Sequence, residues 1–243
     1  MIDAHCHLDA EGQLFELLTA NNIPATINCQ TTKEWLTNKQ LVSHFPFLSL
    51  SAGIHPWDAD QMSFSEFLPI LEEASIIGEI GMDNEWTSVP LTTQEIIFRK
   101  QLALASEHSK PVILHTKGME KQIANIIQEY PNTYLVHWYS SLDYLENYIE
   151  LDTYFTVGPS LTTDPAVQQV IKQVPLERLL FESDGLEALA WAKEVTKDDI
   201  EYLMIQQENL EQFALLKGIS YKELVSQLKM NYSQWINKKE RNQ

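Results

Sequence analysis

The strongest constraint on the fold is a regular alternation of short apolar segments with longer amphipathic ones. The short segments are rich in β-branched residues and predict strands at 2–5, 25–29, 47–53, 75–80, 112–115, 134–137, 153–157 and 178–183. Helical periodicity predicts helices at 11–21, 32–44, 63–73, 92–108, 119–130, 141–150 and 164–173, and then at 197–217 and 220–236. Strands that alternate with helices in this way are typical of βαβ units and a parallel sheet.

The number and order of these segments favour a closed barrel. Eight strands, each followed by a helix, in 243 residues match the size of a TIM-type barrel. An open doubly wound sheet is the alternative, but its first turn ordinarily carries a glycine-rich phosphate loop, and here that turn reads HCHLD at 5–9. No repeat or Pro/Gly-rich linker marks a boundary. We therefore predict an α/β fold in which residues 1–243 form a single TIM-type (β/α)8 barrel domain.

The charge of the chain bears on its partners. With 34 acidic and 17 basic residues, the formal net charge is −17, and a field of that sign repels polyanions unless the binding face is locally compensated. Divalent ions would return positive charge to one cleft. The composition therefore weakens a nuclease hypothesis without excluding it.

Several features bear on location. The longest apolar runs fall far short of the roughly 20 residues that span a bilayer, so we predict no membrane association. The N-terminus lacks the basic and apolar segments of a signal peptide. Cys6 and Cys29, the two cysteines, lie in apolar strand-like contexts that suit reduced buried thiols. We expect a cytoplasmic protein, and nothing in the sequence predicts a protein partner.

Histidines and carboxylates gather at the ends of predicted strands. Five of the seven histidines lie at or just beyond the C-terminal end of a predicted strand. Glu79 and Asp184 lie similarly at the fourth and eighth strands. Carboxyl-terminal strand ends of a barrel open onto one face, where barrel enzymes gather their catalytic groups. His5 and His7 are two apart on a strand, so their side chains point to the same side.

This donor set predicts a metal centre. Imidazoles with carboxylates, and no thiolate motif, suit Zn²⁺, Mg²⁺ or Mn²⁺ held for hydrolysis better than a structural zinc site. Six donors exceed what one ion usually needs once water is included. We predict one or two divalent metal ions, held by His5, His7, Glu79, His115, His137 and Asp184.

Five segments resemble a known family. MIDAHCHLD (1–9), GIHPW (53–57), GEIGMD (78–83), PVILHTK (111–117) and LLFESD (179–184) are similar, in order and spacing, to TatD-like metal-dependent hydrolases (TatD family DNases) of the amidohydrolase superfamily. The resemblance covers nearly the whole chain.

The resemblance also implies roles for single residues. It implies that His5, His7 and Asp184 hold one ion, that His115 and His137 hold a second, and that Glu79 bridges them. Glu79 and Asp184 would be the catalytic carboxylates, and Asp184 would accept a proton from the attacking water. His55 would face the substrate instead of a metal.

The chain departs from the family around the substrate. Family members usually carry proline close after the last-strand aspartate, where this chain has Gly185, and their Arg-Asn-Glu-Pro element has no equivalent here. Lys117 stands where arginine is common, and WYSS at 138–141 replaces a short Phe-Ser-Gly-like turn. Lys117 and Trp138 are candidate substrate-binding residues. The alternatives are a solvated loop lysine and an aromatic residue that covers the barrel end.

Three functions remain open at this point. The first is a metal-dependent hydrolase acting on ester bonds, with single-stranded DNA or a small phosphate ester as substrate and a metal-activated water as nucleophile. The second keeps the ions but cleaves a small amide, ester or lactone. The third is a catalytically inactive metal-binding interaction protein.

Overall fold

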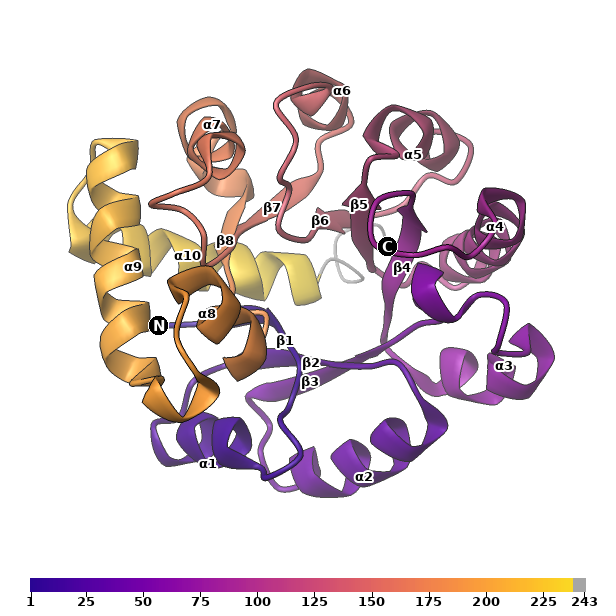
Figure 1. Ribbon diagram of the computed structural model, residues 1–243, viewed down its shortest axis with the longest axis horizontal. Helices are drawn as coiled ribbons and strands as arrows, with labels where there is room; N and C mark the ends of the chain where they lie inside the picture. The colour runs from indigo at the N-terminus through magenta and orange to yellow at the C-terminus, as the bar shows by residue number, and fades with distance from the viewer. Residues whose placement is uncertain (238–243) are drawn as a thin grey trace.

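The computed structural model describes residues 1–237, in which eight parallel strands form one sheet that curls into a nearly closed barrel (Figure 1). Each strand pairs with its neighbours in sequence, in the order β1 to β8. The strands are β1 (Asp3–Cys6), β2 (Ala25–Cys29), β3 (Leu48–Ala52), β4 (Ile76–Asp83), β5 (Val112–Lys117), β6 (Tyr134–Val136), β7 (Tyr154–Val157) and β8 (Leu179–Phe181). The predicted TIM-type barrel is confirmed.

Helices surround the barrel (Figure 1). They are α1 (Gln13–Ala20), α2 (Thr32–Val42), α3 (Phe64–Glu73), α4 (Leu91–Glu107), α5 (Glu120–Ile127), α6 (Leu145–Glu150), α7 (Pro165–Gln173), α8 (Leu186–Lys193), α9 (Tyr202–Lys217) and α10 (Tyr221–Ile236). Short 3-10 helices are η1 (Pro56–Asp58), η2 (Leu176–Arg178) and η3 (Lys197–Asp199). Every predicted helix is present, although 197–217 is divided into η3 and α9. The sequence did not predict α8.

Local hydrogen bonds explain where several helices begin. The Thr31 hydroxyl accepts from the backbone N–H of Glu34, whose carboxylate reaches back, so a complete capping box starts α2. Asp164 caps α7 ahead of a proline whose missing N–H costs nothing in the first turn. Ser220 caps α10 by accepting from the N–H of Glu223. These caps fix the residues at which the three helices begin.

Side chains help to join β8 to β1. The buried Asp3 carboxylate accepts hydrogen bonds from the backbone N–H of Ser183 at 2.9 Å, the Ser183 hydroxyl at 2.5 Å and the Tyr202 hydroxyl at 2.9 Å. Burial raises the pKa of Asp3 to about 6. The N–H of Asp184 donates to the carbonyl of His5 at 3.2 Å. His5 and Asp184, two of the predicted metal ligands, therefore lie on opposite sides of this β8–β1 seam.

The close approach of β4 and β5 explains Gly81. A β-carbon at Gly81 would lie 1.9 Å from the carbonyl oxygen of His115, so only a backbone shift makes room for it. We expect Gly81→Ala to lower the free energy of unfolding by about 3 kcal/mol or more, as severe overpacking does. Urea unfolding followed by circular dichroism measures this loss. An added β-carbon at Gly12 meets nothing within 4 Å, so Gly12→Ala tests the left-handed backbone alone, at about 1–2 kcal/mol. Equal losses for the two variants would contradict the clash.

The structure also bears on the cysteines and on the membrane. Cys6 and Cys29 are both buried and unpaired, as predicted. Within residues 1–237, no helix combines the length and apolar character needed to cross a membrane.

Candidate metal centre

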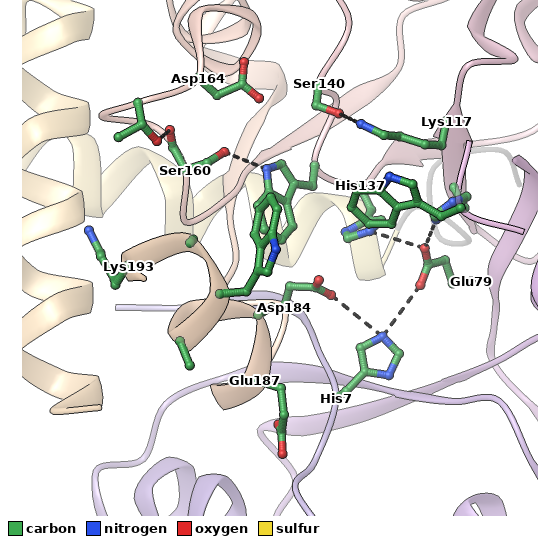
Figure 2. A pocket seen from close by; sticks show the side chains of 18 of the residues that line it. His7, Glu79, Lys117, His137, Ser140, Ser160, Asp164, Asp184, Glu187 and Lys193 are labelled. Atoms are coloured by element: carbon green, nitrogen blue, oxygen red, sulfur yellow. Dashed lines mark hydrogen bonds and ion pairs between the residues drawn. The ribbon is translucent and has the colours of Figure 1, made fainter. Parts of the chain in front are cut away.

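The carboxyl ends of the strands open onto a cavity of about 1340 Å³ (Figure 2). Five predicted ligands line it, and the sixth, His5, is fully buried within β1. His7 lies just beyond β1, Glu79 in β4, His115 in β5, His137 directly after β6 and Asp184 just beyond β8. Residues far apart in the sequence thus meet at one end of the barrel.

Glu79 occupies the centre of this group. Its Oε1 lies 2.6 Å from Nδ1 of His115 and 3.3 Å from Nε2 of His137. Its Oε2 lies 3.5 Å from Nε2 of His5 and 3.6 Å from Nε2 of His7. The two oxygens of one carboxylate therefore face two different sets of imidazoles, which is the position that a bridging ligand needs.

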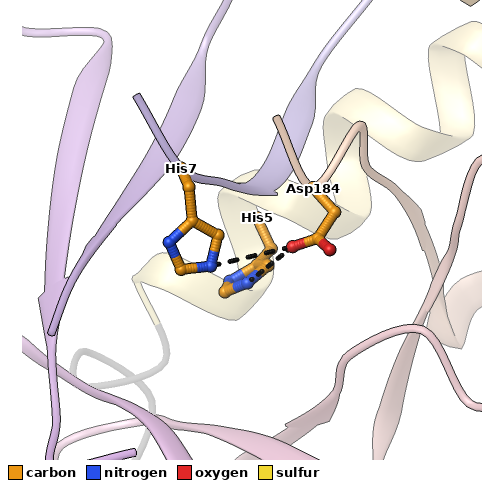
Figure 3. A group of neighbouring side chains, drawn as sticks. All are labelled: His5, His7 and Asp184. Atoms are coloured by element: carbon orange, nitrogen blue, oxygen red, sulfur yellow. Dashed lines mark ion pairs between the residues drawn. The ribbon is translucent and has the colours of Figure 1, made fainter. Parts of the chain in front are cut away.

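His5, His7 and Asp184 form the first ligand group (Figure 3). Oδ1 of Asp184 is 3.3 Å from Nε2 of His5 and 3.7 Å from Nε2 of His7. Both ring nitrogens of His5 and Oδ1 of Asp184 are buried without a hydrogen-bond partner among the described residues. Buried polar atoms are almost always paired in folded proteins. Unpaired donor atoms that converge in this way fit a divalent cation.

His55, Glu79 and His115 form another group whose ligand atoms lie within 4.8 Å of one another. Nε2 of His55 is 3.3 Å from Nδ1 of His115 and 3.5 Å from Oε1 of Glu79. The resemblance implies that His55 faces the substrate. Its ring lies in this cluster and also lines the cavity. A third group consists of His5, Glu79 and His137. His115 and His137 both face Oε1 of Glu79, at 2.6 and 3.3 Å.

Two buried carboxylates orient the imidazoles from behind. Asp83 Oδ2 lies 3.0 Å from Nε2 of His115, and both oxygens of Glu182 lie 3.2 Å from Nδ1 of His137. Each contact leaves the opposite ring nitrogen facing Glu79. Carboxylates in this position behind a histidine fix its tautomer and raise its basicity as a ligand. Asp83 was not identified from the sequence.

The electrostatics of the cluster favour positive charge. Burial alone would lower the pKa of His115, but the carboxylates of Asp83 and Glu79 raise that pKa to about 9. His5 behaves alike, since Asp184 and Glu79 raise its pKa against the effect of burial. Burial acts to raise the pKa of Glu79, yet the surrounding histidines hold it well below its usual value. A buried pocket with this field accommodates cations.

The candidate substrate residues lie at the cavity wall (Figure 2). Lys117 donates to the Ser140 hydroxyl at 2.9 Å, so it is anchored at the wall. Trp138 is half-buried, lines the cavity and donates its indole N–H to Ser160 at 2.9 Å. Tyr139 is buried against Tyr148 of α6 and Phe155 of β7.

Three further tryptophans line the cavity, and the sequence analysis did not identify them: Trp57, Trp86 and Trp191. They lie in η1, in the segment after β4 and in α8. Residues in such connections carry no periodic pattern that would indicate which way they point.

Comparison with known families agrees with this geometry. The family model described as TatD related DNase matches residues 2–237. The chain belongs to this family. YabD of Bacillus subtilis, named a metal-dependent hydrolase, is 26% identical over 202 residues, covering 76% of this chain and 79% of its own.

Two other relatives carry nuclease names. Human deoxyribonuclease TATDN3 is 25% identical over 93% of this chain and 90% of its own. The 3'-5' ssDNA/RNA exonuclease TatD of a Rahnella species is 27% identical over 60% of each chain. Among solved structures, the TatD homologue YjjV of Escherichia coli has the same fold, with a TM-score of 0.81, 20% identity and 97% of each chain covered.

Proposed function

We propose that the protein is a divalent-metal-dependent hydrolase that cleaves phosphodiester bonds in single-stranded DNA. The observation that carries the proposal is the Glu79 carboxylate, which faces imidazoles on both of its oxygens at the floor of an open cavity. Family membership and the nuclease names of two relatives support the phosphodiester as the bond cleaved. The two buried, unpaired cysteines are consistent with a cytoplasmic location.

The donors suit two ions. His5, His7 and Asp184 would hold one ion. His115 and His137, which both face Oε1 of Glu79, would hold the other, with Glu79 between the two ions and His55 at the edge of the second. Zn²⁺, Mg²⁺ and Mn²⁺ all accept nitrogen and oxygen ligands of this kind. When bound, such ions lower the pKa of water toward neutrality and offset charge on phosphate oxygens.

The side chains of the chain have separate tasks. Oδ1 of Asp184 faces two histidines, and among residues 1–237 no hydrogen bond engages Oδ2, so Oδ2 is free to accept a proton from the attacking water. Lys117 lies on the cavity wall at a position suited to pair with a substrate phosphate. Asp83 and Glu182 keep the imidazoles aimed at the reaction centre.

A small amide, ester or lactone is the second candidate substrate. Among the described residues, the cavity lining contains five carboxylates and only two Lys or Arg side chains, Lys117 and Lys193. This acidic lining favours such a substrate over a polyanion. An uncharged substrate meets less repulsion there than a polyanion does.

The test uses chelator-treated protein reloaded with Mg²⁺, Mn²⁺ or Zn²⁺. We expect metal-dependent release of nucleotides from a labelled single-stranded oligonucleotide, and elemental analysis to find one or two ions per chain. Hydrolysis of esters or lactones without nucleotide release would favour the second candidate. Tight metal binding with no turnover of either class of substrate would contradict both hydrolase functions. It would favour the third function, a catalytically inactive metal-binding protein.

A further inference from the structure

Four tryptophans line the cavity from four different connections of the barrel. We refer to Trp57, Trp86, Trp138 and Trp191 as the tryptophan arc, because successive ring centroids lie close together. Trp57 is 6.2 Å from Trp86, Trp86 is 6.2 Å from Trp191, and Trp191 is 5.9 Å from Trp138. Trp86 follows β4 and Trp191 follows β8, which are four strands apart in the sheet order, so their contact crosses the mouth above the metal ligands.

In the part of the chain that the structure describes, the two outer tryptophans of the arc are held by hydrogen bonds, and the two inner ones are not. Trp57 donates its indole N–H to Asp83 at 2.6 Å, and Trp138 donates to Ser160 at 2.9 Å. Trp86 and Trp191 are 56% and 64% exposed, and within residues 1–237 no hydrogen bond holds either indole nitrogen. By contrast, Tyr139 is only 1% exposed and is not among the residues that line the cavity. More than half of each of Trp86 and Trp191 is open to solvent, and both line the cavity.

Few basic side chains near the arc are available to pair with the phosphates of a nucleic acid strand. Of the two lysines on the cavity wall, Lys193 is already bonded to Asn209 at 2.9 Å, and Nζ of Lys117 lies 5.0 Å from the Trp86 ring centre. Carboxylates of Asp164, Glu187 and Glu194 share the same wall. The formal charge of the whole chain is −17. Phosphate pairing therefore has few partners, whereas stacking on indoles has several.

We propose that Trp86 and Trp191 form a stacking platform for a nucleobase of the substrate, and that stacking, more than phosphate charge, supplies its affinity. Aromatic side chains hold bases in this way without sequence preference, because every base has a π-face. Lys117, beside Trp86, would receive the phosphate attached to the stacked nucleotide. The inference rests on the proposed function and adds that the same site binds a base of the substrate.

The experiment compares oligonucleotides that differ by one base. A single-stranded oligonucleotide is prepared intact and as a series in which one position at a time is an abasic tetrahydrofuran residue, so every phosphate is kept. For the Mn²⁺-loaded wild-type protein, we expect one abasic position to raise KM by about 5- to 100-fold. Trp191→Leu and Trp86→Leu should raise KM for the intact strand similarly and remove the difference between intact and abasic strands.

Controls separate stacking from other effects. Trp191→Phe keeps a ring and should recover much of the preference for the intact strand. Tyr221→Leu removes an exposed aromatic residue on α10 outside the cavity and should change nothing. For single strands, two phosphate-binding lysines give a slope of only about −1.4 for the logarithm of the binding constant against the logarithm of the salt concentration. A fourfold rise in salt concentration should therefore weaken binding by less than about tenfold.

Each outcome decides the inference. Metal-dependent cleavage of intact and abasic strands with equal KM would overturn the stacking platform and leave the proposed function standing. A much steeper salt dependence, with no effect of Trp191→Leu, would assign the affinity to phosphate contacts and also overturn it. Cleavage of neither strand would overturn the proposed function, and this inference with it.

Discussion

Glu79→Gln is expected to abolish metal-dependent hydrolysis, with kcat lower by about three orders of magnitude or more. The carboxylate faces five imidazoles within 3.6 Å, and a neutral amide would place an N–H₂ group against nitrogens that need an acceptor or a cation. Metal ions stabilise transition-state charge by several kcal/mol, and each 1.36 kcal/mol is tenfold in rate. The measurements are metal content per chain by elemental analysis and turnover at saturating substrate.

The control for Glu79→Gln is the same substitution at an exposed glutamate. Glu177 lies in η2, immediately before β8 and therefore at the end of the barrel opposite to the site. Glu177→Gln should keep the metal content and turnover of the wild-type protein. If Glu79→Gln bound the same number of ions and turned over at the wild-type rate, Glu79 would not be a bridging ligand and the two-ion site would be wrong.

The fold was predictable because its signal is periodic. Eight apolar strands and the helices between them follow from hydrophobic spacing, which reflects burial on both faces of a parallel sheet. Strand ends were less accurate, since β4 continues to Asp83 and β5 to Lys117. Helix α8 was not predicted, although several of its residues LEALAWAK are good helix formers. A two-turn helix is too short for its periodicity to stand out.

Site residues were predictable from the sequence where they lie at the ends of strands. Residues that orient a ligand or lie in the connections were harder to predict. Glu79, Gly81 and Asp83 alternate along β4 and share a face, so a longer predicted strand would have found Asp83. The place of His55 beside Glu79 depends on the path of the chain after β3, which spacing alone does not give. Whether Trp86 and Trp191 meet depends on contacts between connections 105 positions apart, for which no local pattern exists.

Asp184→Asn is expected to lower kcat by about 10²- to 10⁴-fold, the usual contribution of a positioned general base. The amide oxygen can still face His5 and His7 in place of Oδ1, while the nitrogen that replaces Oδ2 accepts no proton. Asp184 has a left-handed backbone with φ of 59°, and asparagine tolerates this conformation as well as aspartate does. Alanine would add backbone strain to the chemical change and is the poorer choice.

Asp152 provides the matched control for Asp184→Asn. It is also an aspartate in the left-handed region, with φ of 56°, but it is exposed, lies just before β7 and pairs with Arg178. Asp152→Asn should leave kcat unchanged and cost less than about 1 kcal/mol of stability, as surface ion pairs do. Elemental analysis then separates the two roles of Asp184. Retained ions with low kcat indicate proton transfer, and lost ions indicate ligation. Wild-type turnover in Asp184→Asn would exclude Asp184 as the proton acceptor, because the amide nitrogen in place of Oδ2 accepts no proton.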